Sequence, residues 1–205
     1  MKQCFTLLLF LVSASVSFAQ PVGFERSVDM GLWSDRVAVF TDGRVKSFET
    51  FARSHMTYIF GTRSFEGQPA TFTYFDMMIR PERYTDKDIV YVKNKGLRAT
   101  IIGEVDTADP AMFARMNTFM KSGLVSREIL QEPGVRVLLN RLRQDVMRFA
   151  TPVEMIDGAI GASDPRNLWA SLRIVPPANG LFDQPWSTLE AVSDSDILAS
   201  WEKLV

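Results

Sequence analysis

The pattern of apolar side chains between residues 36 and 46 is typical of two short strands joined by a tight turn. Residues 37–40 have the sequence Val-Ala-Val-Phe, the dipeptide Asp42-Gly43 follows, and Arg44-Val45-Lys46 can return antiparallel. An Asp-Gly pair tolerates the positive φ angles that tight hairpin turns require. The sequence therefore predicts a β-hairpin at residues 36–46.

A helix is predicted directly after this hairpin. Ser47 is a suitable N-cap, and Glu49 in the first turn favours the positive end of the helix dipole. From Phe48 to Ile59 the apolar side chains recur at helical spacing, and Gly61 is a plausible C-terminal stop.

Further segments combine helical spacing with capping residues or proline in the first turn. The predicted helices cover residues 69–80, 97–102, 110–120, 126–149 with a break at Pro133-Gly134, 152–160 and 188–204. Short strands are predicted at residues 89–92 and 172–175. The expected fold class is mainly α with a small β component (α+β). We expect a compact helical domain with an N-terminal β-hairpin and one or two short additional strands.

The first 19 residues have the pattern of a secretory signal peptide. Lys2 supplies the positive charge, residues 4–12 are apolar, and Ser17 and Ala19 fit the −3 and −1 positions of a cleavage site. The alternative is a retained membrane anchor, although the apolar run is shorter than a bilayer span. We expect residues 1–19 to be removed on export to the periplasm, and residues 20–205 to form a single soluble domain.

Composition limits the chemistry that this domain can perform. The one cysteine, Cys4, lies in the predicted signal, so neither disulfides nor covalent haem attachment through C-x-x-C-H is expected in the remainder. A net charge of −1 argues against nucleic acid as a partner. A single histidine makes a metal site improbable. The motifs G-x-S-x-G, P-loop and G-x-G-x-x-G are absent, and we therefore expect no enzyme activity.

Two features remain as candidate binding sites. Arg44, Lys46, Arg53 and Arg63 form a basic cluster suited to carboxylates, phosphates or haem propionates. The alternative is a solvated surface whose charges are neutralised by nearby acidic residues. His55, the only histidine, is a candidate haem ligand, and the alternative is a core histidine bonded to a carbonyl. No cofactor is required by either feature.

Several segments resemble a known family when they are taken in order. Residues 39–53, with Gly43-Arg44-Val45-Lys46 and Thr50-Phe51-Ala52-Arg53, are similar to a "GRVKPLDTFAR" signature. The shorter matches are residues 61–67, 79–84, 89–94 and 172–177, and then Trp186-Ser187. Together these segments resemble the extracytoplasmic region of CcsA-type (System II) cytochrome c biogenesis proteins.

The resemblance implies a stand-alone subunit, because the printed chain lacks that family's transmembrane helices and tryptophan-rich haem-handling segment. Ser47 and Glu49 also depart from the usual Pro and Asp of the signature. The implied function is that of an accessory, non-catalytic periplasmic subunit in cytochrome c assembly. The implied binding partner is an integral membrane assembly protein, apocytochrome or haem. The alternative is an envelope interaction or structural domain unrelated to haem.

Overall fold

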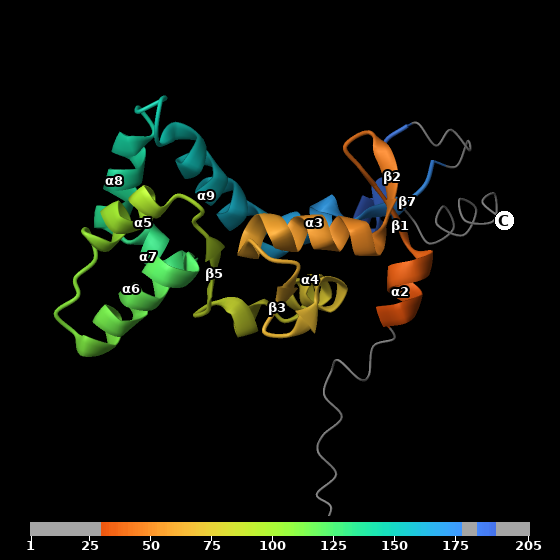
Figure 1. Cartoon of the computed structure of the whole chain (residues 1–205). Helices are drawn as coiled ribbons and strands as arrows, with labels where there is room; N and C mark the ends of the chain where they lie inside the picture. Colours follow the sequence, from red (N-terminus) through yellow and green to blue (C-terminus); the bar gives the residue numbers. More distant parts are fainter. Residues whose placement is uncertain (1–29, 178–183, 192–205) are drawn as a thin grey trace, which may run out of the picture.

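The computed structural model describes residues 30–177 and 184–191 (Figure 1). The predicted signal peptide, residues 1–19, lies outside the described residues. The described α-helices are α2 (Met30–Arg36), α3 (Phe48–Phe60), α4 (Ala70–Ile79), α5 (Lys95–Ile102), α6 (Pro110–Ser122), α7 (Arg127–Gln131), α8 (Pro133–Leu142), α9 (Ala150–Ala162) and α10 (Pro165–Ser171). Two short 3-10 helices are η1 (Pro81–Tyr84) and η2 (Leu189–Ala191).

The described strands form four separate antiparallel pairs rather than one sheet. They are β1 (Ala38–Thr41) with β2 (Arg44–Ser47), β3 (Ser64–Phe65) with β4 (Gln68–Pro69), β5 (Asp88–Tyr91) with β6 (Leu124–Ser126), and β7 (Arg173–Val175) with β8 (Ser187–Thr188). This confirms the mainly helical α+β fold class. In the described part of the chain, six short strands accompany the hairpin. Two of them, β5 and β7, were predicted. The other four, β3, β4, β6 and β8, are two or three residues long, too short for a recognisable sequence pattern.

The predicted hairpin and the helix after it are confirmed. Asp42 and Gly43 form the turn with φ angles of 51° and 72°. The Ser47 side chain caps α3 by accepting a hydrogen bond from the Thr50 amide, and Gly61 ends the helix in the left-handed conformation. The hairpin and the helix therefore follow each other directly, and local sequence signals determine the turn, the start of the helix and its end.

The elements gather in two groups that share one core. Figure 1 shows α5, α6, α7 and α8 at one end, and the hairpin, α2, α3 and α4 at the other, with β5 and α9 between them. Both β5 and α9 contact α3. The buried apolar side chains of the two ends belong to one contiguous cluster that extends from Val39 to Val175.

The helix predicted up to Phe149 ends earlier than the apolar pattern suggested. It ends at Leu142, and residues 143–149 form a series of turns. The Asp145 side chain accepts a hydrogen bond from the Arg148 amide, a local bond that competes with helical pairing. Val146, which we expected on the apolar stripe of this helix, is 78% exposed, and its neighbour Met147 is 92% exposed.

The last predicted helix, residues 188–204, is also wrong at its start. Ser187 and Thr188 form β8, and residues 189–191 form η2. Thr188 pairs with Arg173 of β7, so a tertiary strand pairing overrides the local helical pattern there. The remainder of this predicted helix lies outside the described residues. Of the helices in residues 30–177 and 184–191, none has the length and apolar character needed to cross a bilayer.

Candidate functional site

Two of the four predicted binding residues lie on β2 of the hairpin. Arg44 is exposed next to the turn, and Lys46 is about four-fifths buried. The Lys46 ammonium donates a 2.7 Å hydrogen bond to Asp42, across the turn. This hydrogen bond and charge lower the pKa of Asp42, which therefore stays ionised. Among the described residues, the hairpin consequently presents one cation without an ion pair, Arg44, and one cation that is already partly neutralised.

Arg53 and Arg63 are brought together at a second position. Arg53 lies on α3 and Arg63 follows the end of that helix, yet both line one shallow depression. Glu49, Ser64 and the beginning of α4 complete its walls. The depression has a volume of about 280 Å³, and both polar and apolar atoms line it. Because β3 packs against α3, Arg63 comes close to Arg53. The sequence spacing alone did not predict this proximity.

The charge in this depression is available to a partner. Arg53 forms a 2.5 Å ion pair with Glu49, but both side chains are roughly half exposed. Exposed pairs one helical turn apart contribute only about 0.3–0.5 kcal/mol, so a stronger anion can displace Glu49. Within the described residues, neither Arg63 nor Arg44 has an ion-pair partner. Three of the four predicted cations, Arg44, Arg53 and Arg63, are thus exposed, and they are divided between the hairpin and the α3 depression, whereas Lys46 is largely buried and paired.

His55 occupies a different environment from the arginines. Its ring is half-buried on α3, between Phe51 and Tyr74, with ring centroids 5.2 and 5.3 Å away. Burial lowers the pKa of His55, which favours the neutral imidazole. A neutral imidazole is the form that ligates iron.

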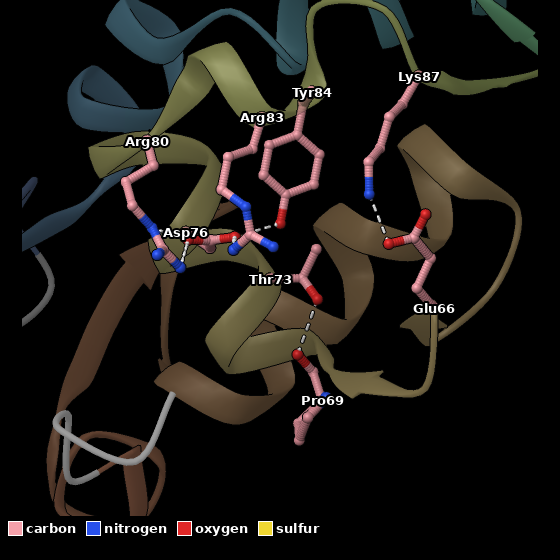
Figure 2. Close-up of polar contacts among 8 residues, drawn as sticks. All are labelled: Glu66, Pro69, Thr73, Asp76, Arg80, Arg83, Tyr84 and Lys87. Atoms are coloured by element: carbon pink, nitrogen blue, oxygen red, sulfur yellow. Dashed lines mark hydrogen bonds and ion pairs between the residues drawn. The ribbon is translucent and has the colours of Figure 1, made fainter. Parts of the chain in front are cut away.

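The most extensively bonded polar cluster of the described chain is centred on Asp76, which the sequence analysis did not single out. Figure 2 shows Arg80, Arg83 and Tyr84 pointing toward the Asp76 carboxylate. Arg80 pairs with one carboxylate oxygen; Arg83 Nη1 and the Tyr84 hydroxyl each donate 2.8 Å hydrogen bonds to the other. Asp76 is completely buried.

This cluster fastens the 3-10 helix η1 onto α4. Burial and the hydrogen bond to Asp76 raise the pKa of Tyr84, so its hydroxyl stays protonated and remains a donor. Nearby, Lys87 forms a 2.5 Å bond with Glu66 in the β3–β4 turn, as Figure 2 also shows. The one signal in the sequence was a lone Asp within the apolar run of α4, followed by arginines. Every Asp76 oxygen is engaged internally, so the cluster's observed role is structural.

Comparisons with known proteins add no assignment. No family model matches the chain, and no curated protein is similar to it. In the described part of the chain, no group of three His, Cys, Asp or Glu side chains lies close enough to hold a metal ion. The exposed arginines of the hairpin and the α3 depression are the candidate site that charge and exposure indicate.

Proposed function

We propose that this protein is an accessory, non-catalytic subunit of cytochrome c assembly that acts in the periplasm. In this proposal it binds an integral membrane assembly protein through its cationic hairpin and α3 surface. The proposal rests on the order of the resembling segments and on how those segments pack.

The observation that carries the proposal is that resembling segments far apart in sequence contact one another. Phe40 of the first segment stacks on Trp186 of the last, with ring centroids 6.4 Å apart. Gly61 of the second segment lies against the Tyr91 ring of the fourth. Phe65 of that second segment likewise approaches the Tyr84 ring of the third, at 5.9 Å. Because these segments pack against one another in one folded unit, their presence together in the chain is tied to the fold. This supports the resemblance.

The partner-binding surface follows from exposure and charge. Arg44, Arg53 and Arg63 keep their guanidinium groups accessible, and such groups bind carboxylates and phosphates in a bidentate manner. The proposed partner therefore presents acidic side chains, or the propionates of a haem that it carries. Binding through exposed charges also predicts an affinity that falls as the salt concentration rises.

The first experiment is deletion of the gene, followed by haem staining of membrane and soluble fractions. The expected result is a loss of c-type cytochromes that the wild-type gene restores. A double variant, Arg53→Glu with Arg63→Glu, should restore less than the wild type, whereas Arg166→Glu, an exposed control on α10, should restore fully. Normal levels of every c-type cytochrome in the deletion strain would contradict the proposal.

A pull-down distinguishes the proposal from an envelope role unrelated to haem. Tagged protein should retain a multi-helix cytochrome assembly protein from solubilised membranes, and the Arg53→Glu and Arg63→Glu variant should retain less. Capture of unrelated envelope proteins alone would favour the alternative.

Direct haem binding is tested separately. Haem is titrated into the wild-type protein and into His55→Ala, and the Soret band is followed. No Soret shift in the wild type removes haem from the proposal, and an equal shift in both proteins removes His55 as its ligand.

A further inference from the structure

The connection between α8 and α9 carries the two most exposed large apolar side chains of the described residues. Val146 is 78% exposed and Met147 is 92% exposed. They lie at adjacent positions in the turns of residues 143–149, which project from the end of the molecule that holds α8 (Figure 1). Apolar side chains at the tip of a projecting loop lose hydration only when they enter another phase or another molecule.

Positive charge surrounds this tip. Residues 133–149 contain Arg136, Arg141, Arg143 and Arg148 and one acidic residue, Asp145. Four positive charges and one negative charge give this segment a formal charge of +3, whereas the whole chain carries −1. The arginines are exposed on α8 and on the loop itself. The segment is thus strongly basic on a molecule that is otherwise slightly acidic.

The acidic groups nearby leave two of these cations free. Asp157 of α9 pairs with Arg143, and Glu104 lies 3.8 Å from Arg141. The Asp145 carboxylate accepts a hydrogen bond from a backbone amide of the loop, and Glu154 is exposed on the first turns of α9. In the part of the chain that the structure describes, neither Arg136 nor Arg148 forms an ion pair.

A shallow depression next to the loop is suited to an anionic head group. Arg136 and Arg143 line it with the polar side chains of Gln131 and Asn140. The Asp157 carboxylate, which already pairs with Arg143, also lines it. Its volume is about 330 Å³. A phosphate placed there would contact the Arg136 guanidinium and would compete with Asp157 for Arg143.

We propose that residues 143–149 and the exposed face of α8 form a docking surface for an anionic phospholipid bilayer. Val146 and Met147 enter the interfacial region of the bilayer, and Arg136 and Arg148 contact lipid phosphates. An apolar tip surrounded by arginines matches the layered chemistry of a lipid surface, which is apolar beneath a charged plane. A protein interface of ordinary size would instead need a broad patch, and this apolar feature is two residues long. The inference rests on the loop and on α8, and it does not depend on a role in cytochrome assembly.

The test uses the chain from Gln20 onward, which contains every described residue and no cysteine. Met147→Cys then provides a unique site for an environment-sensitive NBD fluorophore. The labelled protein is mixed with vesicles of phosphatidylcholine alone, or with vesicles that also contain one-third phosphatidylglycerol. With the anionic vesicles, the emission should shift to the blue and increase in intensity, and high salt should reverse the change.

Val45→Cys is the matched control, because Val45 is also exposed and lies between Arg44 and Lys46 on the hairpin. A probe there should report no change with either vesicle. An NBD signal at position 147 that stays unchanged with anionic vesicles, or a shift of equal size at position 45, would overturn the proposed surface.

Sedimentation with vesicles tests the charged and apolar parts separately. Arg136→Gln and Arg148→Gln should each weaken binding to anionic vesicles by about fivefold. The exposed pair Val146→Asp and Met147→Asp should abolish binding without altering the circular dichroism spectrum. Unlabelled protein that remains in the supernatant with both vesicles, or variants that bind like the wild type, would also refute the inference. Because the readout is lipid binding, its failure leaves the cytochrome proposal standing, and the reverse is also true.

Discussion

Gly61 lies against the face of the Tyr91 ring, so closely that a Cβ atom at position 61 would be 2.5 Å from two ring carbons. Gly61 ends α3 with a φ of 72°, and Tyr91 ends β5. The contact therefore fixes how α3, the helix that carries Arg53, approaches the central strand. Only glycine satisfies both the positive φ and the close approach.

We predict that Gly61→Ala destabilises the protein substantially. The left-handed backbone costs about 1–2 kcal/mol for a residue with a Cβ, and the overlap with Tyr91 adds about 1–3 kcal/mol. Gly43→Ala is the matched control, since its φ is also 72° but no atom lies within 4 Å of the added Cβ. Urea unfolding should give a clearly larger loss for position 61. Equal losses at both positions would show that the Tyr91 ring can move away from the added Cβ without loss of stability.

A second prediction concerns the buried Asp76 carboxylate. Asp76→Asn should lower the free energy of unfolding by about 3 kcal/mol, because it removes the charge that holds two arginines. We place the value at the low end of the range for buried pairs, since Arg80 and Arg83 are 27% and 42% exposed and can hydrate.

The control for Asp76 is Glu66→Gln, which removes an exposed partner of Lys87 and should cost less than about 1 kcal/mol. Both variants are measured by denaturant unfolding at the same ionic strength. A loss at Asp76 no larger than that at Glu66 would mean that the cluster contributes little to stability.

Local signals in the sequence predicted most of the secondary structure. Ser47, Asp109 and Ser126 each cap a helix through a side-chain oxygen, as their positions before apolar periodic segments indicated. The prediction failed where local and tertiary preferences conflict. Residues 143–149 keep an apolar period yet end the helix, and Thr188 pairs with β7 instead of starting one.

The candidate site was less predictable than the secondary structure. The four basic residues were identified because charge and sequence proximity are visible in the chain. That Arg53 and Arg63 share a depression depends on the β3–β4 turn, and a contact of this kind has no sequence period. The Asp76 cluster was missed for the same reason, since Tyr84 reaches it from a separate 3-10 helix.

The third prediction concerns pH. Burial lowers the pKa of His55 below its ordinary value of 6.5, so the unfolded chain binds a proton more readily than the folded one. The free energy of unfolding should therefore decrease as the pH falls through 6.5 toward the lower folded-state pKa. Above pH 7 the contribution is constant.

The test of this pH dependence is a comparison between the wild type and His55→Gln. The free energy of unfolding of each protein is measured in urea at pH 7.5 and pH 5.5. Subtracting the change in the variant from the change in the wild type cancels the effect of the carboxylates that both proteins share. The variant should lose less stability than the wild type over this interval. Parallel pH profiles for the two proteins would place the imidazole in a solvated environment instead.

The last prediction concerns Arg98, a buried cation that donates hydrogen bonds to carbonyl groups and also lies over the Tyr91 ring, 5.6 Å from its centroid. Only 3% exposed, it donates hydrogen bonds to the carbonyl oxygens of Val92 at 2.6 Å and Met120 at 3.0 Å. A third contact, 3.4 Å long, reaches Lys121 in the last turn of α6. The guanidinium thus joins β5 to the C-terminal end of α6, where unpaired carbonyls and the negative end of the helix dipole favour a cation.

We expect Arg98→Lys to lower the free energy of unfolding by about 2–4 kcal/mol, although the charge is kept. A lysine ammonium lacks the planar fork that reaches two elements at once, so at least one buried carbonyl loses its donor. Arg166→Lys on the exposed face of α10 should change stability by less than about 0.5 kcal/mol. Hydrogen exchange gives a second readout, because amides near the end of α6 should exchange faster in Arg98→Lys while those in α3 do not. Unchanged protection in α6, together with wild-type stability, would show that charge alone suffices at this position and that the fork geometry is dispensable.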